Sequence, residues 1–195
     1  MPIADTPPWV VTVLVVCAYL VGSLSPGWWL VRHYAGTDLR DEGSGATGAT
    51  NAARVLGKRG YAYVLLLDAL KGLFAVWAVR KLAPDAAWIS LAGPAVVAGH
   101  IWPIFLGFRG GKGAATYMGA CLVWNPWIVL VAWVPGLAAG IFFPKGFVVR
   151  SIAFLASLPI GWWLISDPPG RCSFILAWSL VLLAHRDHFA KPLVR

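Results

Sequence analysis

The chain has 195 residues, of which 59% are hydrophobic and 12% are charged, and its mean hydropathy is +0.71. These values exclude an ordinary soluble domain and a disordered chain, and they predict an all-α integral membrane protein with one domain over residues 1–195. A net charge of +8 would suggest nucleic acid for a soluble chain. Here we attribute it to cytoplasmic loops and anionic ligands, and we expect no nucleic-acid partner.

The first apolar stretch, residues 6–31, carries no charge and predicts one membrane-spanning helix. Within it, the glycines, serines and proline of residues 22–27 should kink or break the helix. No basic segment or clear cleavage site precedes the stretch, so we predict a retained span and not a removed signal peptide. A polar loop is predicted over residues 32–60.

Six further spans are predicted downstream, which brings the total to seven. The charge-free stretch between Lys112 and Lys145 is too long for one helix, so we divide it at the Asn125–Pro126 turn. A second turn is predicted over residues 166–170. The remaining four spans cover residues 61–79, 86–108, 151–165 and 172–189.

The distribution of basic residues predicts the orientation of these spans. If the N-terminus lies outside, seven spans place the C-terminus in the cytoplasm, and most of the 16 lysines and arginines fall in inner loops. Only Arg80, Lys81 and Arg171 then lie in outer loops. The short glycine-rich loops and both C-terminal histidines, His185 and His188, fall on the cytoplasmic side.

Two glycine-rich segments indicate anion binding. One is GGKG at residues 110–113, and the other covers residues 43–51, with Arg54 close behind it. Glycines expose backbone N–H groups and allow positive φ, and Lys112 adds a cation. Two such loops predict a phosphorylated substrate used at a membrane surface, although glycine runs in membrane proteins also serve helix packing.

Other polar residues have simpler interpretations. Asp68 and Lys71 lie on one helical face and predict a structural ion pair inside the membrane, with catalysis as the alternative. His100 is interpreted as a buried hydrogen-bonded residue, with ligand binding as the alternative. No carboxylate or cysteine cluster accompanies His185 and His188, so we expect no metal. The three separated cysteines, at positions 17, 121 and 172, predict buried structural thiols.

Six motifs occur in one order along the chain and carry a family resemblance. They are GSLSP (22–26), GSGATGATNAARVLGK (43–58), LDALKG (67–72), GHIWP (99–103), FRGGKGAAT (108–116) and HRD (185–187). Together they resemble the acyl-phosphate-dependent glycerol-3-phosphate acyltransferases, the PlsY family of bacterial membranes. The resemblance extends over nearly the whole chain.

The resemblance implies a seven-helix, multi-pass enzyme of the bacterial cell membrane with its active site facing the cytoplasm. It would move a fatty acyl group from acyl phosphate to the 1-hydroxyl of glycerol 3-phosphate, giving lysophosphatidic acid and phosphate for phospholipid synthesis. No metal, cofactor or coenzyme A is implied. The implied partners are the two substrates and the lipid bilayer, and the enzyme that supplies acyl phosphate is a further candidate.

The matching motif positions predict the site residues. Four are predicted to be catalytic: Ser44, Arg54, Lys112 and His185. Nine are predicted to bind substrate: Gly45, Thr50, Asn51, Gly110, Gly111, Gly113, Thr116, Ser151 and His188.

Acyl phosphate is already activated, so the site must position the substrates and neutralise charge more than supply a nucleophile. Arg54 can grip a phosphate bidentately, and Lys112 can act as a point charge. His185 could orient or deprotonate the hydroxyl. Family members are thought to use a substrate phosphate as the base, which would leave His185 a binding role.

The chain departs from the family pattern at three positions. Ala46 and His188 stand where the family usually has asparagine, and Phe154 stands where it usually has a second serine. These exchanges leave open a diverged paralogue that acylates another polyol phosphate. A transporter or scramblase for a phosphorylated small molecule is the non-enzymatic alternative, but the charged motifs lie on one side and no inverted repeat is evident.

One further pattern formally matches another acyltransferase class. His33 and Asp38 have the spacing of the HX4D motif of that class. The pair follows directly after a predicted span and lies in a loop, without the globular domain that the class requires. We interpret this match as coincidence.

Overall fold

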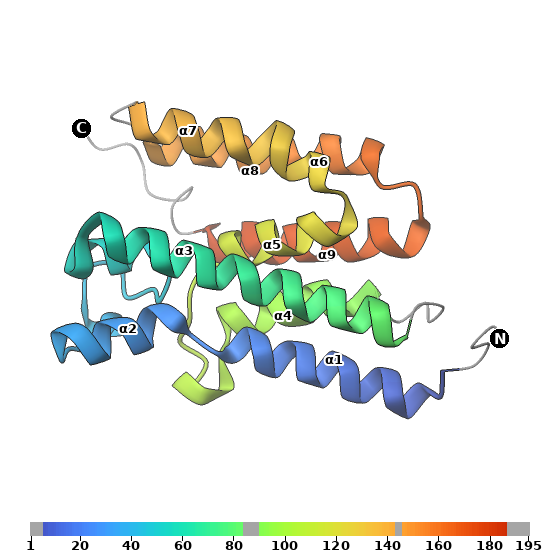
Figure 1. Ribbon diagram of the computed structural model, residues 1–195, viewed down its shortest axis with the longest axis horizontal. Coiled ribbons are helices and arrows are strands. Elements are labelled where there is room, and N and C mark those ends of the chain that lie inside the picture. Colours follow the sequence, from blue (N-terminus) through green and yellow to red (C-terminus); the bar gives the residue numbers. More distant parts are fainter. Residues whose placement is uncertain (1–5, 84–89, 143–145, 187–195) are drawn as a thin grey trace.

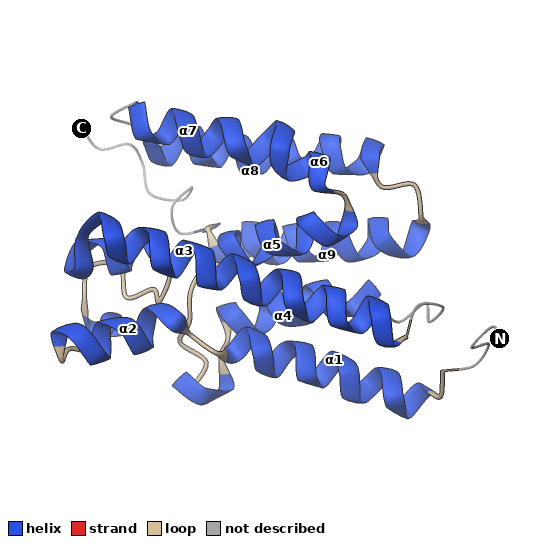
Figure 2. Ribbon diagram, in the orientation of Figure 1, coloured by secondary structure: helices blue, strands red, loops and turns tan. Residues whose placement is uncertain are grey.

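The computed structural model describes residues 6–83, 90–142 and 146–186, and its regular structure in these ranges is entirely helical (Figure 1; Figure 2). This confirms the prediction of an all-α fold. The α-helices are α1 (Pro8–Ser23), α2 (Pro26–Ala35), α3 (Ala49–Leu82), α4 (Ala92–Ile101), α5 (Ala114–Trp124), α6 (Pro126–Ile128), α7 (Val134–Phe142), α8 (Gly146–Leu164) and α9 (Pro168–Ala184). Short 3-10 turns η1 (Leu39–Asp41) and η3 (Ile104–Leu106) and a π-helical stretch η4 (Val129–Trp133) complete the list.

The predicted break in the first apolar stretch is confirmed. Helix α1 ends at Ser23, and α2 begins at Pro26, with Leu24 and Ser25 between them. Proline fits this position because the first residue of a helix has no intrahelical partner for its N–H and needs the φ that proline already has. Figure 1 shows the two helices separated at this point.

The predicted loop over residues 32–60 is wrong in its second half. Helix α3 already begins at Ala49, and Gly57 interrupts it with φ 67° and ψ −160°. Since glycine adopts positive φ without a steric penalty, the chain kinks at Gly57 and stays helical on both sides. The sequence pattern, which is polar and contains glycine, instead predicted a loop here and a helix only from residue 61.

Other helix boundaries also differ from prediction, and α8 begins at Gly146 and not at residue 151. Helix α4 ends at Ile101, well before residue 108, because Pro103 disfavours helical geometry in the residue that precedes it. Helix α9 begins at Pro168, inside the predicted turn, and the Asp167 carboxylate caps it by accepting a 2.7 Å hydrogen bond from the Gly170 N–H.

The turn predicted at Asn125–Pro126 is confirmed. Helix α5 ends at Trp124, and the Asn125 side chain accepts a hydrogen bond from the Trp127 N–H at the start of α6. From there α6, η4 and α7 follow as one helical stretch, and α7 packs against α8 (Figure 1).

Span length is not uniform among the described helices. Two helical stretches, Pro8–Ala35 and Ala49–Leu82, are long and apolar enough to cross a membrane by length and composition, and five shorter apolar stretches accompany them. The count of seven spans therefore stays a prediction.

Helix α3 crosses α5 at unusually close range through a pair of glycines. A Cβ on Gly72 would meet the Thr116 carbonyl, and a Cβ on Gly119 would meet the Ala69 carbonyl. Such small residues let backbones approach when no hydrophobic force distinguishes a neighbouring helix from lipid. This crossing fixes the N-terminus of α5 against α3.

We expect Gly119→Val to lower the melting temperature in detergent by several degrees, because the added carbons meet backbone atoms that cannot rotate away. Leu122→Val is the matched control, since it places the same β-branched residue in α5 at a half-exposed position. Equal melting temperatures for the two variants would contradict the described crossing.

An aromatic cluster fills the core between α5, α8 and α9. The fully buried Tyr117 ring lies 5.6–6.2 Å from the rings of Phe174, Phe154, Trp124 and Trp133. This cluster forms one side of the site described below.

The prediction that all three cysteines are buried is correct only for Cys121, and Cys17 and Cys172 are exposed. Lipid-facing and core positions are equally apolar, so the sequence around a cysteine cannot distinguish them.

Candidate active site

A cavity of about 190 Å³ collects most of the predicted site residues. All four residues predicted to be catalytic line it: Ser44, Arg54, Lys112 and His185. Four predicted to bind substrate line it as well: Thr50, Asn51, Gly113 and Ser151.

An adjoining cavity of about 280 Å³ is lined by the predicted residues Gly45, Gly110 and Gly111. It shares Ser44 and Lys112 with the first cavity. The fully buried Thr116 lines neither cavity, because it packs at the crossing of α3 and α5. His188 lies outside the described residues.

Two helix N-termini converge on the first cavity. Helix α3 begins after Gly48, and α5 begins after Gly113, whose φ of 80° requires glycine. In these two described helices the first turn contains no acidic residue, so no carboxylate there offsets the positive end of the helix. Because a helix N-terminus carries a partial positive charge, each end favours a bound anion.

Asn51 organises the first glycine-rich loop. Its side-chain nitrogen lies 2.9–3.0 Å from the carbonyls of Leu39, Glu42 and Ala46, and its oxygen accepts hydrogen bonds from the Ser44 N–H and the Arg54 guanidinium, each at 3.0 Å. The residue is 2% exposed. The Asn51 amide thus forms its hydrogen bonds within the protein. This favours a role in positioning Ser44 and Arg54 over direct contact with substrate.

Gly43 allows this arrangement by its lack of a side chain. Its φ is +50°, and a Cβ at this position would collide with the Arg54 guanidinium and the Asn51 amide. The glycine therefore leaves room for Arg54 as well as bending the chain.

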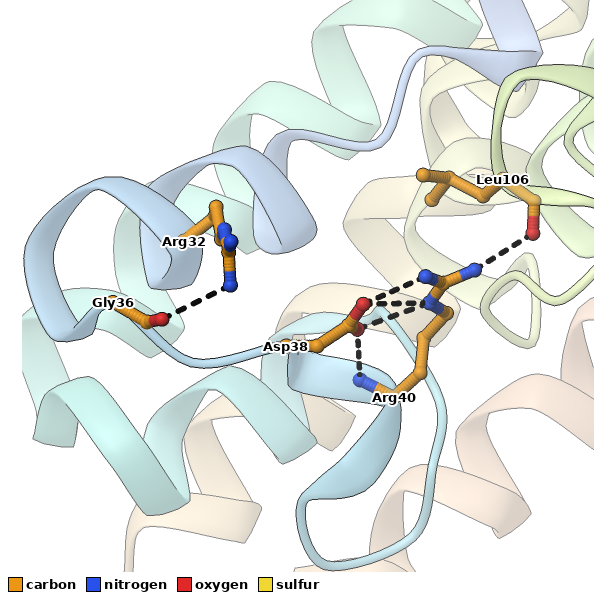
Figure 3. Close-up of polar contacts among 5 residues, drawn as sticks. All are labelled: Arg32, Gly36, Asp38, Arg40 and Leu106. Carbon is orange, nitrogen blue, oxygen red and sulfur yellow. Dashed lines mark hydrogen bonds and ion pairs between the residues drawn. The ribbon is translucent and has the colours of Figure 1, made fainter.

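Arg40, just before the first glycine-rich loop, forms a salt bridge with Asp38 and also reaches the segment before the second loop (Figure 3). The guanidinium contacts the carboxylate at 2.6–3.2 Å and donates a 2.9 Å hydrogen bond to the Leu106 carbonyl. Hydrogen bonds from Arg40 hold the pKa of the Asp38 carboxyl well below its usual range. Asp38 thus pairs with Arg40, while the His33 ring packs against Tyr34. Each residue of the HX4D pattern has its own partner, which supports the interpretation of this pattern as coincidence.

The second glycine-rich loop is held against the end of α4. The Gly111 N–H donates a 3.0 Å hydrogen bond to the His100 carbonyl, and the Gly110 carbonyl accepts one from the Thr47 N–H at 3.3 Å. Because the Gly111 N–H already donates to a carbonyl, it is not a donor for an anion. The predicted anion site is therefore limited to the backbone N–H groups at the start of α5. Lys112 follows directly and contributes to both cavities.

The geometry of His185 defines which ring nitrogen can act as an acceptor. The residue caps α9, and its Nδ1 lies 2.8 Å from the Val181 carbonyl. A carbonyl can only accept, so Nδ1 carries the hydrogen, and Nε2 is the lone-pair nitrogen of the neutral ring.

Phe154 provides an aromatic contact beside this histidine. The centroid of its ring lies 6.3 Å from that of the His185 ring. The Phe154 ring also stacks on the Trp178 ring, with 5.2 Å between the centroids. A serine at this position would not fill that space.

The remaining lining of the first cavity is mostly apolar. Leu65, Met118, Trp133, Leu137 and Phe154 form the apolar wall. Sequence reasoning identified Phe154 only as a departure from the family pattern, and it did not predict the other four residues, because they lie in no motif and resemble other membrane-buried side chains. It also missed that Asp68 and His100 line the cavity, although both lie in motifs of the family resemblance.

Comparison with known proteins places the chain in a family. The model of the glycerol-3-phosphate acyltransferase family matches residues 12–194. The chain belongs to this family. Among its relatives, glycerol-3-phosphate acyltransferase 1 of Desulfitobacterium hafniense is 37% identical over 186 residues, covering 92% of this chain and 89% of the relative. Glycerol-3-phosphate acyltransferase of Gloeobacter violaceus is 41% identical over 182 residues, covering 90% and 88%.

Solved structures of the family share the fold. The crystal structure of PlsY (YgiH), an integral membrane glycerol 3-phosphate acyltransferase, in its glycerol 3-phosphate form has a TM-score of 0.83 and 30% identity, covering 92% of this chain and 90% of that one. Its lysophosphatidic acid form has a TM-score of 0.81 and 28% identity, with the same coverage. The chain is thus an integral membrane protein of the glycerol-3-phosphate acyltransferase family.

Proposed function

We propose that the chain transfers a fatty acyl group from acyl phosphate to the 1-hydroxyl of glycerol 3-phosphate, releasing lysophosphatidic acid and inorganic phosphate. Family membership and the names of the relatives support the acceptor. The observation that carries the proposal is a single cavity in which two helix N-termini, Arg54 and Lys112 adjoin an apolar wall. Two anionic groups and a fatty chain are what such a cavity accommodates.

The charge distribution suggests how the two phosphates are held. We assign one phosphate to Arg54 and the N-terminus of α3, and the other to Lys112 and the N-terminus of α5. The wall formed by Leu65, Met118 and Trp133 would receive the acyl chain. This placement brings the acyl carbonyl to the boundary between the polar and apolar parts.

The reaction then needs no covalent enzyme intermediate. The hydroxyl oxygen of glycerol 3-phosphate attacks the acyl carbonyl carbon, the bond from that carbon to the bridging oxygen breaks, and phosphate leaves with the hydroxyl proton. His185 Nε2 accepts a hydrogen bond from the attacking hydroxyl. This contact directs a lone pair of the hydroxyl oxygen toward the acyl carbonyl carbon. Lys112 and the start of α5 stabilise the negative charge that develops on the carbonyl oxygen and the departing phosphate.

We expect the purified protein to form product with acyl phosphate and not with acyl-CoA. The family resemblance implies acyl phosphate as the donor, and the cationic lining residues Arg54 and Lys112 suit a small phosphate group. Initial rates with the two donors at equal concentration, and the same acyl chain, check this. Comparable rates would contradict the proposed donor.

The cavity is also proposed to open to the cytoplasm, on the basis of the charge bias of the loops. In a chain without native cysteines, Ser44→Cys should react with an impermeant thiol reagent from the cytoplasmic side only. Ser166→Cys is the matched control, because it is an exposed serine in the loop between α8 and α9, at the opposite end of the helices (Figure 1). It should react only from outside, and reaction of Ser44→Cys from outside would contradict the orientation.

A further inference from the structure

Three ionisable side chains meet inside the helix bundle next to the cavity. Asp68 and Lys71 come from α3, and His100 comes from α4, and they are 1%, 8% and 4% exposed. The Lys71 ammonium lies 2.9 Å from Asp68 Oδ1, and His100 Nδ1 lies 3.3 Å from the same oxygen. Asp68 and His100 line the cavity as well.

Lys71 has a structural role that needs nothing from the reaction. Its ammonium donates hydrogen bonds to the carbonyls of Gly22 and Leu24, at 2.9 and 2.6 Å. These carbonyls lie where α1 is interrupted, so they lack helical partners. Lys71 thus caps the break between α1 and α2, and Asp68 supplies the counter-charge that a buried ammonium requires.

His100 has no part in that cap and faces the second glycine-rich loop. Its carbonyl accepts the hydrogen bond from the Gly111 N–H, and its ring lies so close to Gly111 that a Cβ there would collide with Nε2. The ring therefore forms the surface on which Gly111 rests. Lys112 is the next residue, and it lines both cavities.

We propose that Asp68 and His100 are positioning residues for the acyl transfer: Asp68 holds the His100 ring, and the ring seats Gly111 and thereby places Lys112. The proposal rests on the function proposed above for Lys112. A structural ion pair would need only Asp68 and Lys71, and it would need neither His100 nor a place in the cavity wall. Small displacements of a charged group cost large factors in rate, so this contact should matter more for turnover than for folding.

The test is a double-mutant cycle between His100 and Lys112, measured as kcat/KM for acyl transfer. We expect His100→Leu to lower it by on the order of 10- to 100-fold, and His100→Asn, which keeps a donor at the Nδ1 position, to lower it less. In the Lys112→Ala background, His100→Leu should cause no more than about a threefold further loss, because the group it positions is gone. The same cycle with His100→Asn provides a milder change, should His100→Leu not fold.

Val96→Ala is the control, because Val96 is fully buried in α4 one turn before His100 and lines neither cavity. It should lower the melting temperature while kcat/KM stays within a few-fold of wild type. If the His100 and Lys112 losses multiply, or if Val96→Ala loses as much activity as His100→Leu, the positioning inference is overturned and the proposed function stands. If Lys112→Ala is fully active, the proposed role of Lys112 fails, and this inference fails with it.

Discussion

Lys112→Ala is expected to lower kcat/KM for acyl transfer by on the order of 100-fold or more, because it removes a charge-assisted contact to a phosphate whose charge changes during the reaction. Lys112 lies between the two cavities and directly before the N-terminus of α5. No other lysine or arginine among the described residues lines both cavities. The loss should therefore appear in kcat as well as in KM.

Arg109→Ala is the control for Lys112→Ala. It removes the same charge from the same loop, but Arg109 is exposed and lines neither cavity. We expect its kinetics to stay within a few-fold of wild type. Comparable losses in both variants would mean that Lys112 acts through the overall charge of the loop and not through a contact.

Arg54→Ala is expected to have an effect of similar size, on the order of 100-fold or more in kcat/KM, through the loss of a bidentate phosphate contact. The Asn51 amide aims the guanidinium, and Gly43 leaves it room, so the group is held in place before substrate binds. Arg54→Lys should recover only part of the activity, because an ammonium retains the charge but cannot form the fork-shaped contact.

Arg59→Ala is the matched control for Arg54, because it removes an exposed arginine of α3 that does not line either cavity. Its activity should be close to wild type. Near-normal kinetics of a folded Arg54→Ala variant would remove Arg54 from the site and leave one of the two phosphates without a side-chain cation.

Local sequence rules predicted the features that depend on single residues. Pro26 and Pro126 mark helix starts because proline lacks an N–H and has a fixed φ, and both are found where expected. The same rules were wrong at Gly57 and Pro168, where the residue is compatible with both a loop and a helix. At Pro168 a local helix-start signal, Asp167 as the cap followed by proline, was interpreted as a turn, and at Gly57 a glycine with positive φ kinks the helix without ending it.

Site residues could be predicted where a cationic residue lies in a glycine-rich segment. They could not be predicted where their role depends on contacts with residues distant in the sequence. Arg54 and Lys112 lie in glycine-rich segments, which marks them as anion ligands. The role of Asn51 as the organiser of its loop depends on carbonyls up to 12 residues away. Likewise, the contact of His100 with Gly111 requires the turn that η3 makes after α4.

One of the departures from the family pattern has a structural account. The Ala46 carbonyl accepts a hydrogen bond from the Asn51 amide, but any residue at position 46 could supply that carbonyl, so nothing in the structure explains the alanine. Phe154 joins the aromatic cluster and packs beside His185, so it adds apolar surface where a serine would add a hydroxyl. Both changes leave the cationic residues of the cavity in place.

The most direct test of the account is the stoichiometry of products formed by the purified protein from acyl phosphate and glycerol 3-phosphate. We predict that lysophosphatidic acid, identified by mass, and inorganic phosphate appear in equal amounts, and that neither forms at that rate when glycerol 3-phosphate is omitted. The same protein in sealed vesicles should not accumulate labelled glycerol 3-phosphate. Vesicle uptake of glycerol 3-phosphate without any lysophosphatidic acid would contradict the account and indicate a transporter.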